Sequence, residues 1–152
     1  MEKPVKPSGK RRIARELAVQ FLYQYDLSGG PLEEALPLFW ETQAEVSEDG
    51  RKFTEELVQG VVGHRVAIDE RIAKYTENWD LPRIAAVDRN ILRLAMYEML
   101  FRDDIPPVVS INEAVDIAKK FSTRESGAFV NGILDRLKAD LTRPSRTAAS
   151  AQ

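Results

Sequence analysis

Residues 91–101 read ILRLAMYEMLF, and this segment is apolar around most of its circumference when it is drawn as a helix. A helix that is apolar on nearly all sides is covered by its neighbours, so the segment predicts the most buried element of the fold. Pro82, a little upstream, suits the first turn of this helix. The sequence DDIPP at 103–107 predicts where the helix ends.

The segments on both sides of this central helix also have helical periodicity. Apolar residues recur at spacings of three and four in residues 14–25, 53–75 and 130–141. Ser110 and Glu113 have the spacing of a capping box ahead of a further helix that extends to Phe121. No segment has the alternation of a strand, so the sequence predicts an all-α fold.

The length and the distribution of apolar residues predict one domain. The chain has 152 residues and is 43% hydrophobic, which suffices for a single core. We expect a compact helical bundle of two packed sub-bundles, in which the helices up to about Tyr75 form one half. The predicted boundaries are a flexible basic arm at 1–9, the helical domain at 10–141 and a disordered tail at 142–152.

The composition argues against an enzyme. The chain has no cysteine and one histidine, so disulfides, thiolate metal sites and cysteine nucleophiles are excluded. His64 lies on an apolar stripe and is predicted to be a core residue. We expect no catalytic residues, no metal site and no cofactor, because no carboxylate cluster or phosphate-binding loop is recognisable. No segment has the length and apolarity of a membrane span or signal peptide, which predicts a cytoplasmic protein.

Basic residues are concentrated at the start of the chain. Residues 1–25 carry a net charge of +4, although the whole chain carries −2. On a helical wheel Arg11, Arg12 and Arg15 share an arc with Tyr23 beside the apolar stripe. Arginine supplies a planar fork for phosphates and a face on which bases stack, so the arc predicts an RNA-binding helix. The alternative is a solvated basic helix end.

Two further features of the sequence are a carboxylate on a buried helix face and a pair of aromatic residues beside a polar loop. Glu98 falls on the buried side of the central helix, and we expect it to pair with Arg102, Asn112 or Asn131. Phe121 and Phe129 frame the polar loop STRESGA, where rings either belong to the core or remain exposed for base stacking.

Several segments together resemble the NusB family of transcription antitermination factors. They are RRIARELAVQFLYQ at 11–24, DRNILRLAMYEML at 88–100, INEAVDIAKKF at 111–121 and FVNGILDRL at 129–137. The resemblance implies a helical fold and a role in processive antitermination during ribosomal RNA synthesis. It also implies a heterodimer with NusE that binds the single-stranded boxA element and joins RNA polymerase with other Nus factors. Whether the free protein is a monomer or a homodimer is left open.

The resemblance also assigns roles to individual positions. The implied RNA-binding residues are Arg11, Arg12, Arg15, Phe121, Glu125 and Phe129, and the implied NusE-binding residues are Tyr23, Leu27 and Asp88. Ile13 interrupts the basic motif and Ala128 replaces a basic residue, so we expect weaker RNA binding without NusE. The alternative function is a helical protein-interaction module, or an accessory domain of an rRNA-modifying system, without its own RNA specificity. Since nothing follows Gln152, the stand-alone factor is expected rather than a methyltransferase fusion.

Overall fold

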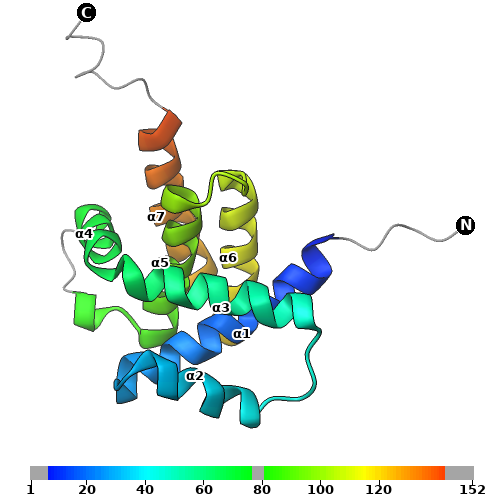
Figure 1. The fold of residues 1–152 in the computed structure, drawn as a ribbon. Coiled ribbons are helices and arrows are strands. Elements are labelled where there is room, and N and C mark those ends of the chain that lie inside the picture. The colour runs from blue at the N-terminus through cyan, green and yellow to red at the C-terminus, as the bar shows by residue number, and fades with distance from the viewer. Residues whose placement is uncertain (1–6, 77–80, 143–152) are drawn as a thin grey trace, which may run out of the picture.

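The computed structural model describes residues 7–76 and 81–142. This part of the chain forms seven α-helices and one short 3-10 helix, with no strand (Figure 1). The elements are α1 (Pro7–Ser28), α2 (Leu32–Glu41), α3 (Glu48–Gly63), α4 (Arg65–Tyr75), the 3-10 helix η1 (Leu81–Arg83), α5 (Ala86–Phe101), α6 (Pro107–Phe121) and α7 (Arg124–Thr142). The all-α prediction is confirmed.

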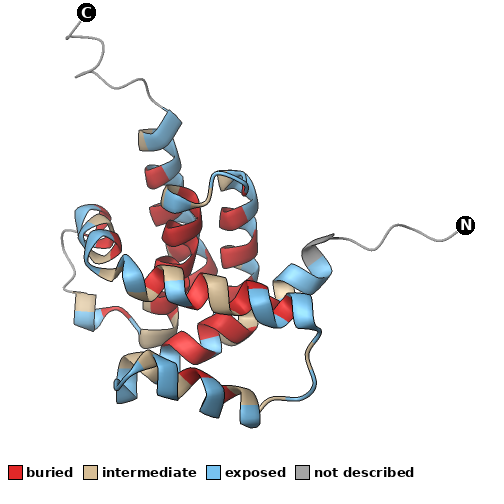
Figure 2. Cartoon of the chain, viewed as in Figure 1, coloured by how far each residue is buried: buried red, intermediate tan, exposed pale blue. Residues whose placement is uncertain are grey.

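Helix α5 is the centre of the fold. Every residue from Asn90 to Met99 is buried, and α5 packs against α1, α3, α4, α6 and α7. Figure 2 shows this helix buried along most of its length, whereas α2 and α4 expose their outer faces. The apolar segment at 91–101 therefore lies largely in the core, as its composition predicts. Its first turn begins at Ala86, and Pro82 lies in η1 instead.

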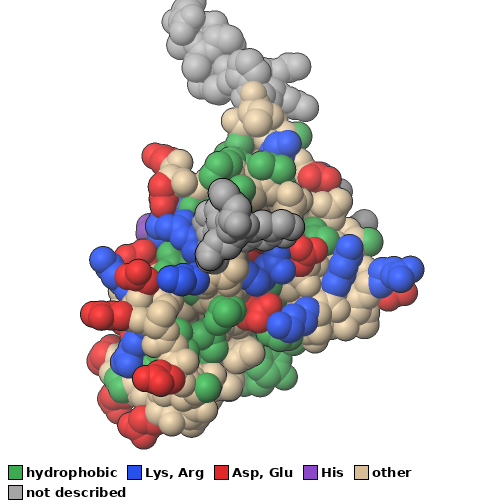
Figure 3. Space-filling model, turned by 90° about the vertical axis from the view of Figure 1, so that its right-hand side faces the viewer, with side chains coloured by type: hydrophobic (Ala, Val, Ile, Leu, Met, Phe, Trp, Pro, Cys, Tyr) green, Lys and Arg blue, Asp and Glu red, His purple; other side chains and the backbone are tan. Residues whose placement is uncertain are grey.

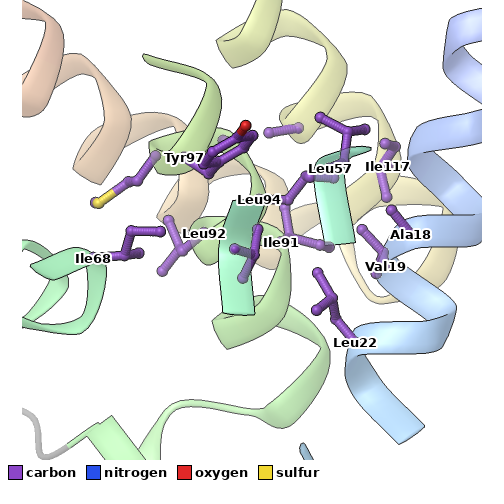
Figure 4. Close-up of a cluster of buried hydrophobic side chains, with 14 of the residues drawn as sticks. Ala18, Val19, Leu22, Leu57, Ile68, Ile91, Leu92, Leu94, Tyr97 and Ile117 are labelled. Carbon is purple, nitrogen blue, oxygen red and sulfur yellow. The ribbon is translucent and has the colours of Figure 1, made fainter. Parts of the chain in front are cut away.

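One hydrophobic cluster joins the helices around α5. Figure 4 shows side chains from several helices meeting there. They include Ala18, Val19 and Leu22 of α1, Leu57 of α3, Ile68 of α4, Ile91 and Leu92 of α5, and Ile117 of α6. Burial of a large aliphatic side chain is worth about 1.5–3 kcal/mol, so this shared core holds both parts of the bundle together.

The division into two parts differs from the prediction in the position of α4. Helices α1, α2 and α3 pack together, while α5, α6 and α7 form the second group (Figure 1). Helix α4 packs mainly against α5 and α7, although it precedes them in the chain. The prediction that all helices up to Tyr75 form one half is therefore wrong for α4. The chain changes direction at His64, which lets α4 leave α3.

His64 is exposed, so the prediction of a core histidine is wrong. The helical pattern that runs through residues 53–75 is interrupted there, because α3 ends at Gly63 and α4 begins at Arg65. The interruption moves the imidazole away from the buried stripe. Its Nδ1 lies 3.0 Å from the carbonyl oxygen of Gly60, and its ring stacks on Phe101 with 3.9 Å between centroids.

The ends of the domain also differ slightly from the prediction. Helix α1 begins at Pro7, so residues 7–9 of the predicted arm are helical, and α7 includes Thr142. The rest of the predicted arm and tail lies outside the described residues. Gly29 and Gly30 end α1 with φ angles of +68° and +93°, which glycine adopts without a Cβ clash. In the described part of the chain, no helix combines the length and apolarity needed to span a bilayer.

Candidate nucleic-acid interface

The three arginines at the start of α1 lie in three different environments. Arg11 is exposed, and its guanidinium lies 4.2 Å from the centroid of the Phe53 ring. The Arg12 side chain is 31% exposed, whereas Arg15 is only 2% exposed. The three arginines therefore extend from the solvent into the core. Helix α6 contacts Arg12, and α5 together with α6 covers Arg15.

Arg15 is held inside the bundle by the carboxylate of Glu98. Its Nε and Nη2 donate to the two carboxylate oxygens at 2.7 and 3.1 Å, and Nη1 lies 3.5 Å from Glu113. Ser110 also donates to Glu98, at 2.6 Å. The predicted pairing of Glu98 with Arg102, Asn112 or Asn131 is therefore wrong. The guanidinium of Arg15 is therefore buried and does not reach the surface.

The capping box predicted at Ser110 and Glu113 is also wrong. Helix α6 begins at Pro107, so both residues lie inside the helix and their side chains face the ion pairs of α1. Proline is well suited to this first helical position, because it has no N–H to leave unpaired. The residues that looked like a local cap instead connect α6 to α1 and α5.

Arg12 is engaged by two acidic side chains of α6. It donates to Glu113 at 2.6 and 2.7 Å and to Asp116 at 2.9 Å. The hydrogen bond to Glu113 raises the pKa of Arg12 above its ordinary value. Asp116 is exposed, so this end of the arrangement borders the solvent. Arg12 is thus a surface cation whose charge is largely matched by its own protein.

Side-chain contacts between α1 and α6 lead from the arginines to the first aromatic ring. Arg12 contacts Asp116, and one turn further along α1 Glu16 accepts from Lys120 at 3.0 Å. Phe121 follows Lys120 directly. Phe121 therefore lies little more than one helical turn along α6 from Asp116, the residue that Arg12 contacts. Figure 3 shows Lys and Arg side chains interspersed with Asp and Glu on the face viewed there.

Phe121 and Phe129 are both half-buried and lie on either side of the turn between α6 and α7. Thr123 caps α7, because its Oγ1 accepts from the backbone N–H of Ser126 at 3.0 Å. Glu125 is exposed in the first turn of α7. Phe121, Glu125 and Phe129, which the resemblance places at an RNA surface, therefore lie at or near the turn between α6 and α7. Part of each phenylalanine ring is open to solvent.

Two lysines near this turn were not recognised as site residues from the sequence. Lys119 and Lys120 are exposed in the last turn of α6, and Lys120 Nζ lies 5.8 Å from the centroid of Phe121. Lys119 runs along Gly127, where an added Cβ would approach its Cγ to 2.9 Å. Basic residues in a last helical turn also complement the helix dipole, so their presence alone did not indicate a binding site.

A second basic patch links α1 to α3. Lys10, Arg11 and Lys52 line a hollow with a volume of about 380 Å³, together with Asp49, Glu56 and Phe53. The hollow continues the basic start of α1 onto α3. The sequence did not indicate this link, because Lys52 lies far from Arg11 in the chain and is brought to it only by the packing of α1 on α3.

The residues implied to bind the partner are divided between the surface and the interior. Tyr23 and Leu27 are one turn apart on α1, with 37% and 65% of their surface exposed. Asp88 at the start of α5 is only 7% exposed, and it accepts from Ser126 Oγ at 3.0 Å. Tyr23 and Leu27 therefore form an accessible apolar pair, whereas Asp88 faces α7.

The side chains on this surface are suited to binding a nucleic acid. Among residues 7–76 and 81–142, no group of three or more His, Asp or Glu side chains is placed to hold a metal. What the surface offers is cations, half-exposed rings and carboxylates along neighbouring helices. Cations contact phosphates, rings stack on bases, and carboxylates accept from base edges, which together suit a single-stranded nucleic acid.

The comparisons with known proteins identify the family of the chain. The NusB family model matches residues 12–139. The transcription antitermination protein NusB of Trichlorobacter lovleyi is 54% identical over 131 residues, which cover 86% of this chain and 92% of the relative. A solved NusB structure from T. maritima is 37% identical, with a TM-score of 0.74, and the match covers 90% of this chain and 91% of that one.

A second solved structure contains a partner and RNA. It is a crystal structure of the antitermination factors NusB and NusE in complex with double-stranded RNA. The matched chain is 31% identical to this one with a TM-score of 0.76, and the match covers 84% of this chain and 94% of that one. These values establish both the fold and the family relationship.

Proposed function

Since the chain belongs to the NusB family, we propose that it is a transcription antitermination factor that binds boxA RNA of nascent ribosomal RNA together with NusE. The curated relatives are named transcription antitermination proteins, and the family is not a family of enzymes. The observation that carries the RNA-binding part is the series of contacts that leads from Arg12 through Asp116 and Lys120 of α6 to the half-buried ring of Phe121.

The contacts divide the implied RNA-binding residues by role. Arg11 is exposed and supplies a phosphate contact directly. Arg12 supplies a second contact when a phosphate replaces Asp116, the more exposed of its two acidic partners. Arg15 acts as a positioning residue, because its ion pair with Glu98 holds α1 against α5. Lys119 and Lys120 join the proposed surface because they directly precede Phe121.

The small number of free cations predicts modest RNA binding by the protein alone. Three or four phosphate contacts to a single strand correspond to a salt slope of about −2 to −3, at roughly −0.7 per contact. The whole chain carries a net charge of −2, so it offers little additional attraction to a polyanion. NusE is proposed to supply further contacts, and the resulting pair joins RNA polymerase and other Nus factors in the cytoplasm.

Tyr23 and Leu27 are the proposed contacts for NusE on this side of the complex. Large exposed apolar side chains at one helix face are typical of a protein-binding patch. Replacing Leu27 with serine removes the apolar contact with little effect on the fold, because 65% of its surface is exposed. The matched control is Leu38→Ser on α2, where the leucine is 61% exposed. Calorimetry with NusE should show weaker binding for Leu27→Ser alone.

The proposed function is tested by titrating a fluorescent boxA-like RNA with the protein, alone and with NusE, at two salt concentrations. A scrambled RNA is the control. We expect selective, salt-sensitive binding that becomes tighter with NusE. Arg11→Ala should weaken the binding several-fold, whereas Lys138→Ala, which removes the same charge from an exposed position on α7, should leave it unchanged.

The alternative function predicts a different result from the same titration. A helical protein-interaction module would bind NusE but would not discriminate boxA RNA from the scrambled sequence. Loss of RNA discrimination in the complex would contradict the proposed function even if NusE binding persisted.

The oligomeric state of the free protein needs a separate measurement. Sedimentation of the same protein preparation establishes whether the free form is a monomer or a homodimer.

A further inference from the structure

A hollow of about 220 Å³ lies between the start of α5 and the start of α7. It is lined by Arg83, Ile84, Ala85, Asp88, Glu125, Ser126 and Phe129. Asp88 is assigned by the resemblance to the NusE surface, while Glu125 and Phe129 are assigned to the RNA surface. In the structure these three residues line the same hollow, so all three can contact one bound ligand.

The carboxylate of Asp88 is only half satisfied. One oxygen, Oδ2, accepts from Ser126 Oγ at 3.0 Å. The other, Oδ1, has no hydrogen-bond partner, and it is the one buried side-chain nitrogen or oxygen in the described part of the chain for which this holds. A buried acceptor without a donor costs free energy, which a donor entering the hollow would recover.

The surroundings of Asp88 select the kind of donor. Ile84 is buried and Phe129 is half-buried, so the hollow has apolar walls suited to a flat ring. Glu125, exposed at the rim, adds a second carboxylate. Two carboxylates repel a phosphate but accept from the N–H groups of a base edge. Arg83, also exposed at the rim, is placed to pair with the phosphate of the same nucleotide.

We infer that this hollow receives one nucleobase with an exocyclic amino group from single-stranded RNA, and that Asp88 is the residue that recognises the amino group. The inference rests on the proposed function and deepens it. Cytosine, adenine and guanine each carry such an amino group. Uracil presents its N–H between two carbonyl oxygens, which the carboxylate repels, so uracil is disfavoured. Since Oδ1 is covered in the free protein, entry of the base requires side chains that line the hollow to shift.

The test uses the complex of the protein with NusE and a set of boxA-like RNAs. At each position in turn, one amino group is removed by replacing cytosine with uracil, adenine with purine riboside, or guanine with inosine. For the unmodified protein, one position should lose about tenfold in affinity, which is the size expected for one hydrogen bond to a charged acceptor. Asp88→Asn should abolish the discrimination at that position and leave the other positions unchanged.

Two variants accompany Asp88→Asn. Asp135→Asn changes an exposed aspartate on α7 in the same way and should keep the discrimination. Ala85→Leu narrows the hollow from its exposed side without changing the buried carboxylate, so it tests the inference even if Asp88→Asn folds poorly. It should lower affinity for the unmodified RNA to the level of the RNA that lacks the amino group.

The possible outcomes separate this inference from the proposed function. If Asp88→Asn weakens NusE binding but keeps the base discrimination, the hollow binds the partner protein and the inference is wrong. An equal loss of affinity for all RNAs, or no loss, also overturns it. If the unmodified complex does not distinguish boxA RNA from a scrambled sequence, the proposed function fails as well.

Discussion

The guanidinium of Arg15 on α1 and the carboxylate of Glu98 on α5 form a two-point ion pair at 2.7 and 3.1 Å, and both side chains are almost completely buried. This pair lies between the basic start of α1 and the most buried helix of the fold. Glu113 extends it by contacting both Arg15 and Arg12. The basic motif of α1 is therefore part of the internal structure as well as of the surface.

Replacing Arg15 with methionine should destabilise the protein. The change removes the cation and leaves the carboxylate of Glu98 buried without its main partner, which typically costs about 3–5 kcal/mol. Urea unfolding measures the free energy of unfolding, and Arg11→Ala is the control because Arg11 is exposed. The control should change stability by about 0.5 kcal/mol or less. Equal stability of the two variants would show that the pair with Glu98 contributes nothing.

Replacing Asp116 with asparagine should strengthen RNA binding. The change removes one of the two acidic partners of Arg12, so its charge becomes more available to a phosphate. We expect affinity for boxA RNA to rise about two- to fivefold and the salt slope to become steeper by up to about 0.7, the value for one phosphate contact. Asp135→Asn controls for the change in net charge. A similar rise in both variants would mean that the contact with Arg12 is not the cause.

Replacing Gly60 with alanine should be destabilising, because an added Cβ would overlap the ring of Tyr97. Forcing that ring to move typically costs about 1–3 kcal/mol. Gly63→Ala is the matched control, since nothing lies within 4 Å of its added Cβ. Thermal unfolding should show a lower Tm for Gly60→Ala only. Combining Gly60→Ala with Tyr97→Leu should recover part of the loss, and the absence of any recovery would contradict the steric explanation.

The stability of the protein should fall in acid partly because of Asp26. Burial alone would raise the pKa of Asp26, but hydrogen bonds from Arg89 and Asn90 and the charge of Arg93 lower it below its ordinary value. A carboxylate with a depressed pKa stabilises the fold above about pH 4, and this stabilisation is lost as the pH falls through the pKa of the folded state.

Asp26→Asn provides the measurement of this contribution. The free energy of unfolding is determined for both proteins between pH 7 and pH 2. At pH 7 the variant should be less stable, since Arg89 and Arg65 lose a charged acceptor. The difference should narrow as the pH falls below about 4, where Asp26 becomes protonated first in the unfolded chain and then, at its lower pKa, in the folded protein. A difference that stays constant over this range would exclude titration of Asp26 as its source.

The helical class and the central position of α5 could be predicted from the sequence alone. Both depend on local periodicity, and the apolar segment at 91–101 can only be satisfied by neighbours on several sides. The end of α1 at Gly29 and Gly30 was likewise predictable, because these residues tolerate positive φ. The resemblance in the segments at 11–24, 88–100 and 111–137 indicated the family, which the comparisons confirm.

The exposure of each charged residue was decided only by the tertiary structure. The arc of Arg11, Arg12 and Arg15 follows from helical geometry, but which of them faces solvent depends on how α1 meets α5 and α6. Ser110 and Glu113 have the spacing of a local helix cap. In the structure, however, they form hydrogen bonds with the long-range partners Glu98 and Arg12 instead. A sequence pattern specifies neighbours within one helix, whereas buried ion pairs and hollows form between helices that lie far apart in the chain.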